Sequence, residues 1–122
     1  MSTDRQFIGA KGLSMTTGFL DGSAADGLTA LAGGAQAGTP IAASMARFTT
    51  IVTTGDSAQL PAGVSGRDIT VTNATANSLN VFGQTGDVIN ALSANAAFAV
   101  AAGKTCSFFC FTPGQWHTQL GA

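Results

Sequence analysis

From Arg47 onward, short runs of β-branched and aromatic residues alternate with turns rich in glycine, asparagine, aspartate and proline. About eight such runs occur, with a turn signal roughly every 8–12 residues. No stretch in this region has the 3.6-residue period of a helix. This spacing favours an all-β, jelly-roll-like antiparallel β-sandwich over a parallel sheet with helices between its strands. The runs expected to form strands are 48–54, 57–60, 68–73, 78–83, 88–92, 96–100, 104–112 and 115–120.

The run from Lys104 to Thr112 is the most hydrophobic of these strands, and both of its faces carry phenylalanine. Side chains alternate along a strand, so Cys106, Phe108 and Cys110 should share one face. We expect that face to fill the core with Phe82 and Phe98. The opposite face needs a cover, which Trp116, the N-terminal segment or a neighbouring subunit could supply. The expected assembly contacts in this region are Phe109, Phe111 and Trp116.

Residues 1–46 differ from the rest because glycine and alanine dominate and large apolar residues are sparse. They show neither a sustained helical period nor clean alternation. One interpretation is a flexible tail, and the other is an arm that becomes ordered against a neighbour. We favour the arm, in which the apolar side chains of Phe7, Phe19 and Leu20 insert into the neighbour. A flexible linker does not bury its side chains and therefore gains nothing from phenylalanine. Thr39-Pro40 could begin a short helix, but we favour an extended lead-in. The predicted division is an arm over 1–46 and a β-sandwich domain over 47–122.

Charge is unusually scarce: Asp, Glu, Lys and Arg make up 9% of the 122 residues, against a typical share of roughly 25%. A β-protein covered by serine, threonine and asparagine is one explanation. The other, which we favour, is that much of the surface is buried in an oligomer or lattice. No basic cluster is present, so nucleic-acid binding is not expected. The absence of a long apolar run and of a signal-peptide pattern predicts no membrane span and synthesis in a cytoplasm.

No motif in the chain indicates catalysis, a cofactor or a metal. Gly103-Lys104-Thr105 matches the tail of a phosphate-binding loop, but Phe98 stands where that motif requires glycine. Cys106 and Cys110 would lie about 13 Å apart on one strand, beyond disulfide reach. The chain has one histidine and no glutamate, so a metal site is not expected. We therefore predict that the protein is not an enzyme.

The run from Arg47 to His117 resembles small β-sandwich proteins among the structural proteins of tailed bacteriophages. The likeness lies in residues 50–61, 69–82, 85–92 and 101–105, and it ends at Gly114-Gln115-Trp116-His117. The resemblance implies a capsid decoration (cement) protein of jelly-roll type on the outer capsid surface. Such a protein bridges neighbouring major capsid subunits. No binding site carries over residue by residue.

These observations predict a non-enzymatic structural protein of a bacteriophage virion. Its expected partners are the major capsid protein and further copies of itself, with a trimer as our first expectation. The alternatives are another virion component, such as a tail, fibre or head-spike module, and a carbohydrate-binding module. The last of these usually presents several aromatic rings on one sheet face, whereas this chain has one tryptophan and no tyrosine.

Overall fold

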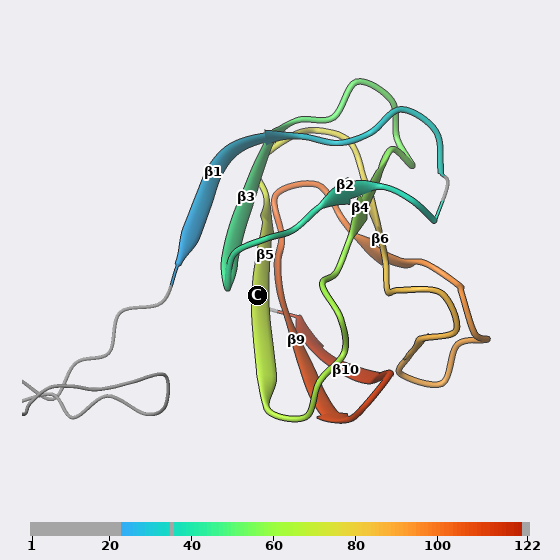
Figure 1. Ribbon diagram of the computed structural model, residues 1–122. Coiled ribbons are helices and arrows are strands. Elements are labelled where there is room, and N and C mark those ends of the chain that lie inside the picture. Colours follow the sequence, from blue (N-terminus) through green and yellow to red (C-terminus); the bar gives the residue numbers. More distant parts are fainter. Residues whose placement is uncertain (1–22, 35, 121–122) are drawn as a thin grey trace, which may run out of the picture.

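The computed structural model describes residues 23–34 and 36–120, which form two β-sheets and no helix (Figure 1). This confirms the predicted all-β class. Sheet A contains, in spatial order, β1 (Ala24–Thr29), β3 (Met45–Thr50), β5 (Arg67–Asn73), β9 (Thr105–Thr112), β10 (Gln115–Leu120) and β7 (Val88–Ile89). Sheet B contains β2 (Thr39–Pro40), β4 (Ser57–Gln59), β6 (Leu79–Phe82) and β8 (Phe98–Val100).

From β1 to β6 the chain alternates between the two sheets, so that each pair of strands makes one coil (Figure 1). The coils stack in parallel, with β1 beside β3 beside β5 in sheet A and β2 beside β4 beside β6 in sheet B. This path is that of a β-solenoid. Among the described strands, antiparallel pairing is confined to β5–β9, β9–β10 and β6–β8, and one isolated antiparallel bridge joins Leu31 and Ser57. The prediction of an antiparallel sandwich is therefore wrong for the coiled part.

The error has a physical cause in the turns. A parallel pair needs a crossover between its strands, and here a strand of the opposite sheet serves as that crossover. The corners of the coils use the same turn residues as hairpins; Gly55 and Gly66, for example, have φ values of 97° and 91°. Turn spacing alone therefore does not separate stacked coils from hairpins.

The predicted boundary between arm and body at residue 46 is also wrong. Residues 23–46 supply β1, β2 and the start of β3, and Ala30, Ile41 and Ala46 from this segment are buried in the core. The segment packs despite its small side chains because its backbone lies close to the next coil. The extended lead-in predicted at Thr39-Pro40 is confirmed as β2. Residues 1–22 lie outside the described residues.

The core lies between the two sheets. Sheet A contributes Phe48, Val71, Phe108 and Trp116, while sheet B contributes Leu79, Val81 and Val100, all of them buried. Each strand predicted after Arg47 has a counterpart, although β3 begins at Met45 and ends at Thr50, β7 is limited to Val88–Ile89 and β8 to Phe98–Val100. The central position predicted for the phenylalanine-rich strand is confirmed too, because β9 pairs with β5 on one side and β10 on the other.

Candidate interaction surface

The two faces of β9 have different environments, as the alternation of its side chains predicts. Cys106 and Phe108 are fully buried and Cys110 is 2% exposed, so the inward face is sealed in the core. Phe108 meets Phe98 edge to face, with 5.8 Å between the ring centroids. Phe82 is also buried in the same body. The inward face predicted for Cys106, Phe108 and Cys110 is therefore confirmed, and Phe98 packs against the core cluster, whereas Phe82 is not part of that cluster.

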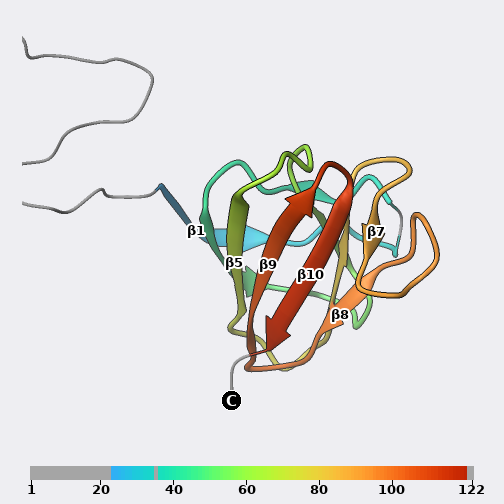
Figure 2. The ribbon, with the colours of Figure 1, turned by 90° about the horizontal axis from the view of Figure 1, so that it is seen from below.

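The outward face of β9 carries an aromatic cluster, which we define as Phe109, Phe111 and His117. Phe111 is 68% exposed, and Phe109 is partly buried. The Phe111 ring centroid lies 6.3 Å from that of Phe109 and 5.5 Å from that of His117. Figure 2 shows β9 and β10 at the front of the body, and no described strand lies in front of them. The cover expected for Phe109 and Phe111 is thus not provided by the described part of the body.

Polar side chains surround the aromatic cluster on the same face. Asp68 of β5 lies directly opposite Phe109 across the strand pair. Hydroxyl groups face each other farther along the same two strands: Thr72 and Thr105 are 2.9 Å apart and Thr70 and Ser107 are 3.5 Å apart. The cluster is therefore an isolated apolar spot on a sheet face made mainly of hydroxyl-bearing residues.

Trp116 does not belong to this surface, so its prediction as an assembly contact is wrong. Its side chain is fully buried, and its indole N–H donates to the Asp87 carboxylate over 3.2 Å. The cause is a register shift between Gln115 and Trp116, which places Trp116 opposite Cys110 rather than Phe111. A shift of one residue turns a side chain to the other face of the sheet.

The structure brings together only part of the predicted contact set. Phe109 and Phe111 lie side by side, and His117, which the sequence analysis did not select, joins them. A regular hairpin would have placed His117 opposite Cys110 on the inward face, so the sequence carried no signal for it; the register shift after Gln115 makes it the partner of Phe109. Phe7, Phe19 and Leu20 lie outside the described residues.

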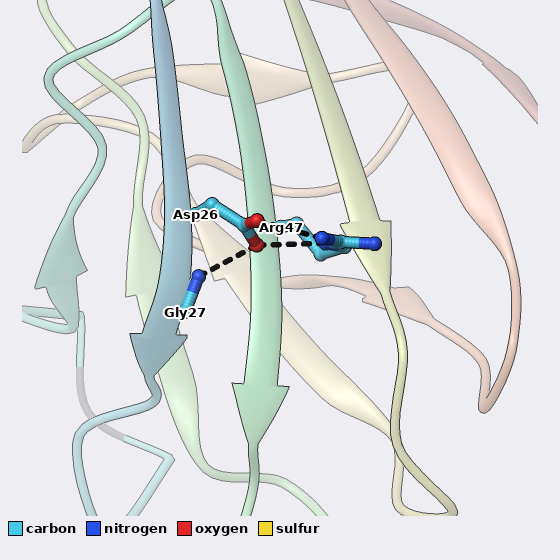
Figure 3. Close-up of polar contacts among 3 residues, drawn as sticks. All are labelled: Asp26, Gly27 and Arg47. Atoms are coloured by element: carbon cyan, nitrogen blue, oxygen red, sulfur yellow. Dashed lines mark hydrogen bonds and ion pairs between the residues drawn. The ribbon is translucent and has the colours of Figure 1, made fainter.

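An ion pair between Asp26 of β1 and Arg47 of β3 also lies on the surface of sheet A. The Arg47 guanidinium donates to both carboxylate oxygens of Asp26, over 2.7 Å from Nε to Oδ1 and 2.6 Å from Nη2 to Oδ2. The same carboxylate also accepts the Gly27 N–H (Figure 3). The hydrogen bond from Arg47 lowers the pKa of Asp26, and the same bond raises the pKa of Arg47. The pair borders a shallow hollow that Ala24, Met45, Thr70 and Thr72 also line. Since both groups are exposed, the pair neutralises charge locally and adds little to stability.

Among the described residues, the buried polar side chains have partners in the turns of the body. Asn73 donates to the carbonyls of Asn77 and Val100, and its side-chain oxygen accepts two bonds from Thr75. The Asp56 carboxylate accepts the backbone N–H groups of Gly33 and Thr53. These side chains hold the turns of the coils in place.

The two cysteines are buried and unbridged. Burial raises the pKa of the Cys106 thiol to about 11. The thiolate is the reactive form of cysteine, so Cys106 is protonated and unreactive near neutral pH.

Alkylation provides a test of this arrangement. Iodoacetamide at pH 8 should leave Cys106 unmodified in the folded protein, because the thiol is both buried and protonated. The same reagent in denaturing urea should modify both cysteines to completion. Mass spectrometry of tryptic peptides measures the two extents. Rapid modification of Cys106 in the native protein would contradict its placement in the core.

Among the described residues, no three His, Cys, Asp or Glu side chains gather closely enough to hold a metal ion. Within residues 23–34 and 36–120, no helix is long and apolar enough to cross a membrane. The chain matches no protein-family model, no curated protein and no solved structure.

Proposed function

We propose that this protein is a non-enzymatic structural component of a bacteriophage virion that decorates and cements the outer capsid. In this proposal it binds across neighbouring major capsid subunits through the outer face of β9 and β10. The observation that carries the proposal is the aromatic cluster, in which the Phe111 side chain is 68% exposed on the outer face of the sheet. Aromatic rings of this kind are typical anchors at the centres of protein interfaces.

The binding free energy expected of one such contact is modest, which suits a protein that binds a lattice in many copies. Complete burial of one phenylalanine side chain contributes about 1.5–3 kcal/mol, which is modest for a single contact. A decoration protein is present in many copies, and copies linked to one another bind with a combined strength above that of each contact. We propose a homo-oligomer, with a trimer as the first form to test. Light scattering of the purified protein measures its mass directly.

The composition supports the same proposal. Charged residues account for 9% of the chain, and the Asp26–Arg47 pair neutralises two of them. Apolar and hydroxyl-bearing surface of this kind is suited to burial against another protein. The jelly-roll arrangement belongs to the proposal as well. It is supported by the two packed sheets and the antiparallel β5–β9–β10 part, and opposed by the parallel coils.

A carbohydrate-binding function is disfavoured by the position of Trp116. Its indole is fully buried and cannot stack on a sugar, so the aromatic cluster would have to do so without the chain's one tryptophan. A tail, fibre or head-spike location remains the competing form of the virion proposal. The two proposals place the protein on different parts of the virion, so imaging of the particle distinguishes them.

The decisive experiment is a cryo-electron microscopy reconstruction of virions that contain this chain. We expect density for the β-body on the outer shell, with β9 and β10 facing the capsid subunits. Density only on the tail or a fibre would replace the capsid proposal with its competitor. Absence of the chain from purified virions would overturn the virion proposal altogether.

A matched pair of variants tests the surface itself. Phe111→Ser should reduce occupancy on capsids at least about tenfold, the loss expected when an interface anchor is truncated. Val52→Ser removes a side chain that is 76% exposed and lies outside the cluster, and its occupancy should equal that of the unmodified protein. Equal occupancy for both variants would show that the aromatic cluster is not the contact.

A further inference from the structure

The carboxylate of Asp68 lies beside the aromatic cluster. In β5 this residue is exposed and stands directly opposite Phe109 of β9. Side chains that are directly opposite across an antiparallel pair share a face of the sheet, with Cβ atoms about 4.5–5.5 Å apart. Among the described residues Asp68 belongs to no ion pair, in contrast to Asp26, which is paired with Arg47. The aromatic cluster therefore borders an exposed carboxylate without a counter-charge in the described part of the chain.

The basic side chains of the described residues are placed elsewhere. Arg67, next to Asp68 in the sequence, donates from Nη1 to the Ala62 carbonyl over 2.8 Å. Arg47 donates to both oxygens of a carboxylate on β1. Lys104 comes just before β9, at the end of the strand farthest from the aromatic cluster. A positive charge that pairs with Asp68 would therefore come from a partner.

The groups around Asp68 suit a cation. The face of an aromatic ring attracts a positive charge, and a carboxylate pairs with one through charge-assisted hydrogen bonds. Asp68, Phe109 and His117 form one row across β5, β9 and β10, in register. The Phe111 ring lies next to both rings of this row. One cation can therefore contact an aromatic face and the carboxylate together.

Arginine fits this arrangement better than lysine. Its guanidinium is planar, so it stacks on a ring while its N–H groups pair with a carboxylate. The lysine ammonium is a compact, strongly hydrated point charge that does not stack. The apolar stem of arginine also covers apolar surface, and Phe111 offers such surface because it is 68% exposed.

We propose that Asp68 and the aromatic cluster form a binding site for an arginine side chain of the protein's partner. The guanidinium lies over the Phe109 ring and pairs with the Asp68 carboxylate, and the arginine stem packs on Phe111. The identity of the partner rests on the proposed function, under which the major capsid subunit presents this arginine. The site itself is testable without a capsid.

A small arginine probe tests the site in the full-length protein. N-acetyl-arginine methylamide is added at pH 7.5 while NMR follows the backbone amides of Asp68, Phe109, Phe111 and His117. The matched probe is N-acetyl-citrulline methylamide at equal ionic strength, because citrulline replaces the guanidinium by an uncharged urea group of similar shape. We expect the arginine probe to bind about tenfold more tightly than the citrulline probe, from one exposed cation–π contact and one exposed ion pair.

Two variants with the same change of charge identify the carboxylate. Asp68→Asn should abolish the preference for the arginine probe. Asp26→Asn removes an exposed carboxylate on β1, outside the aromatic cluster, and should retain the preference. Both side chains are exposed, so neither substitution should unfold the body.

A preference for arginine that Asp68→Asn abolishes and Asp26→Asn retains supports the proposal. Equal binding of the two probes by the unmodified protein overturns it, and the proposed function then stands or falls by the occupancy of capsids alone. A preference that survives in Asp68→Asn overturns it as well, because the carboxylate would not be the anchor. If the arginine preference is found but the protein is absent from virions, the proposed function fails and the arginine site stands.

Discussion

Replacing Phe108 by alanine should lower the free energy of unfolding by about 3–5 kcal/mol. The same change at Phe111, three positions along the same strand, should alter it by no more than about 0.5 kcal/mol. Phe108 is fully buried and packs edge to face on Phe98, whereas Phe111 is 68% exposed. The first substitution opens a cavity between the sheets, and the second removes a ring that lies mainly in solvent.

Urea denaturation followed by the fluorescence of Trp116 measures both effects, because this single tryptophan is buried in the same core. The slope of unfolding free energy against urea should be unchanged in both variants if folding remains two-state. Similar losses for Phe108→Ala and Phe111→Ala would mean that Phe111 is buried in solution. The outer face of β9 would then be covered already, and the aromatic cluster would not be a free interaction surface.

This division of β9 could be predicted because it depends only on alternation. A strand has a side-chain period of two, so Phe108 and Phe109 must point to opposite faces whatever the strand pairs with. The positions of the strands after Arg47 were predictable for a similar reason, since turn residues and β-branched runs act locally. The pairing partners of the strands were not predictable. Alternation determines the sheet face on which a side chain lies, but it does not determine which strand lies next to which.

The first coil was missed because most of its core residues are small, with Ile41 as the exception. Ala30, Ala43 and Ala46 are buried, yet alanine gives little periodic hydrophobic signal. Their burial depends on contact with the following coil, which is a tertiary effect. The segment thus resembles a tail in sequence while forming part of two sheets in the structure.

The candidate site was half predictable. Phe109 and Phe111 follow from alternation in β9, but Trp116 does not follow from the turn that precedes it. A regular two-residue hairpin at Pro113-Gly114 would pair Trp116 with Phe111 on the outer face. The register shift after Gln115 moves Trp116 opposite Cys110 and into the core, where Asp87 accepts its N–H. That shift depends on the tertiary site for the indole, so local sequence does not reveal it.

Gly38→Ala should destabilise the protein by about 3 kcal/mol, the upper part of the range for overpacking a core. Gly38 lies just before β2, where the first coil meets β4 of the second. A Cβ atom at this position would come within 2.5 Å of the Ala58 nitrogen and the Ser57 carbonyl carbon. Both are backbone atoms in a paired strand, so neither moves aside without breaking the contact between coils.

Gly34→Ala is the matched control for this substitution. Its added Cβ would meet the Gly55 carbonyl oxygen at 3.3 Å as its nearest atom, so the cost should stay within about 1 kcal/mol. Urea denaturation of both variants gives the comparison. A large loss confined to Gly38→Ala would establish that residues 23–46 are stacked on the second coil. Equal, small losses would mean that this segment is not packed there, and the arm predicted over residues 1–46 would then describe the protein better than the stacked coils.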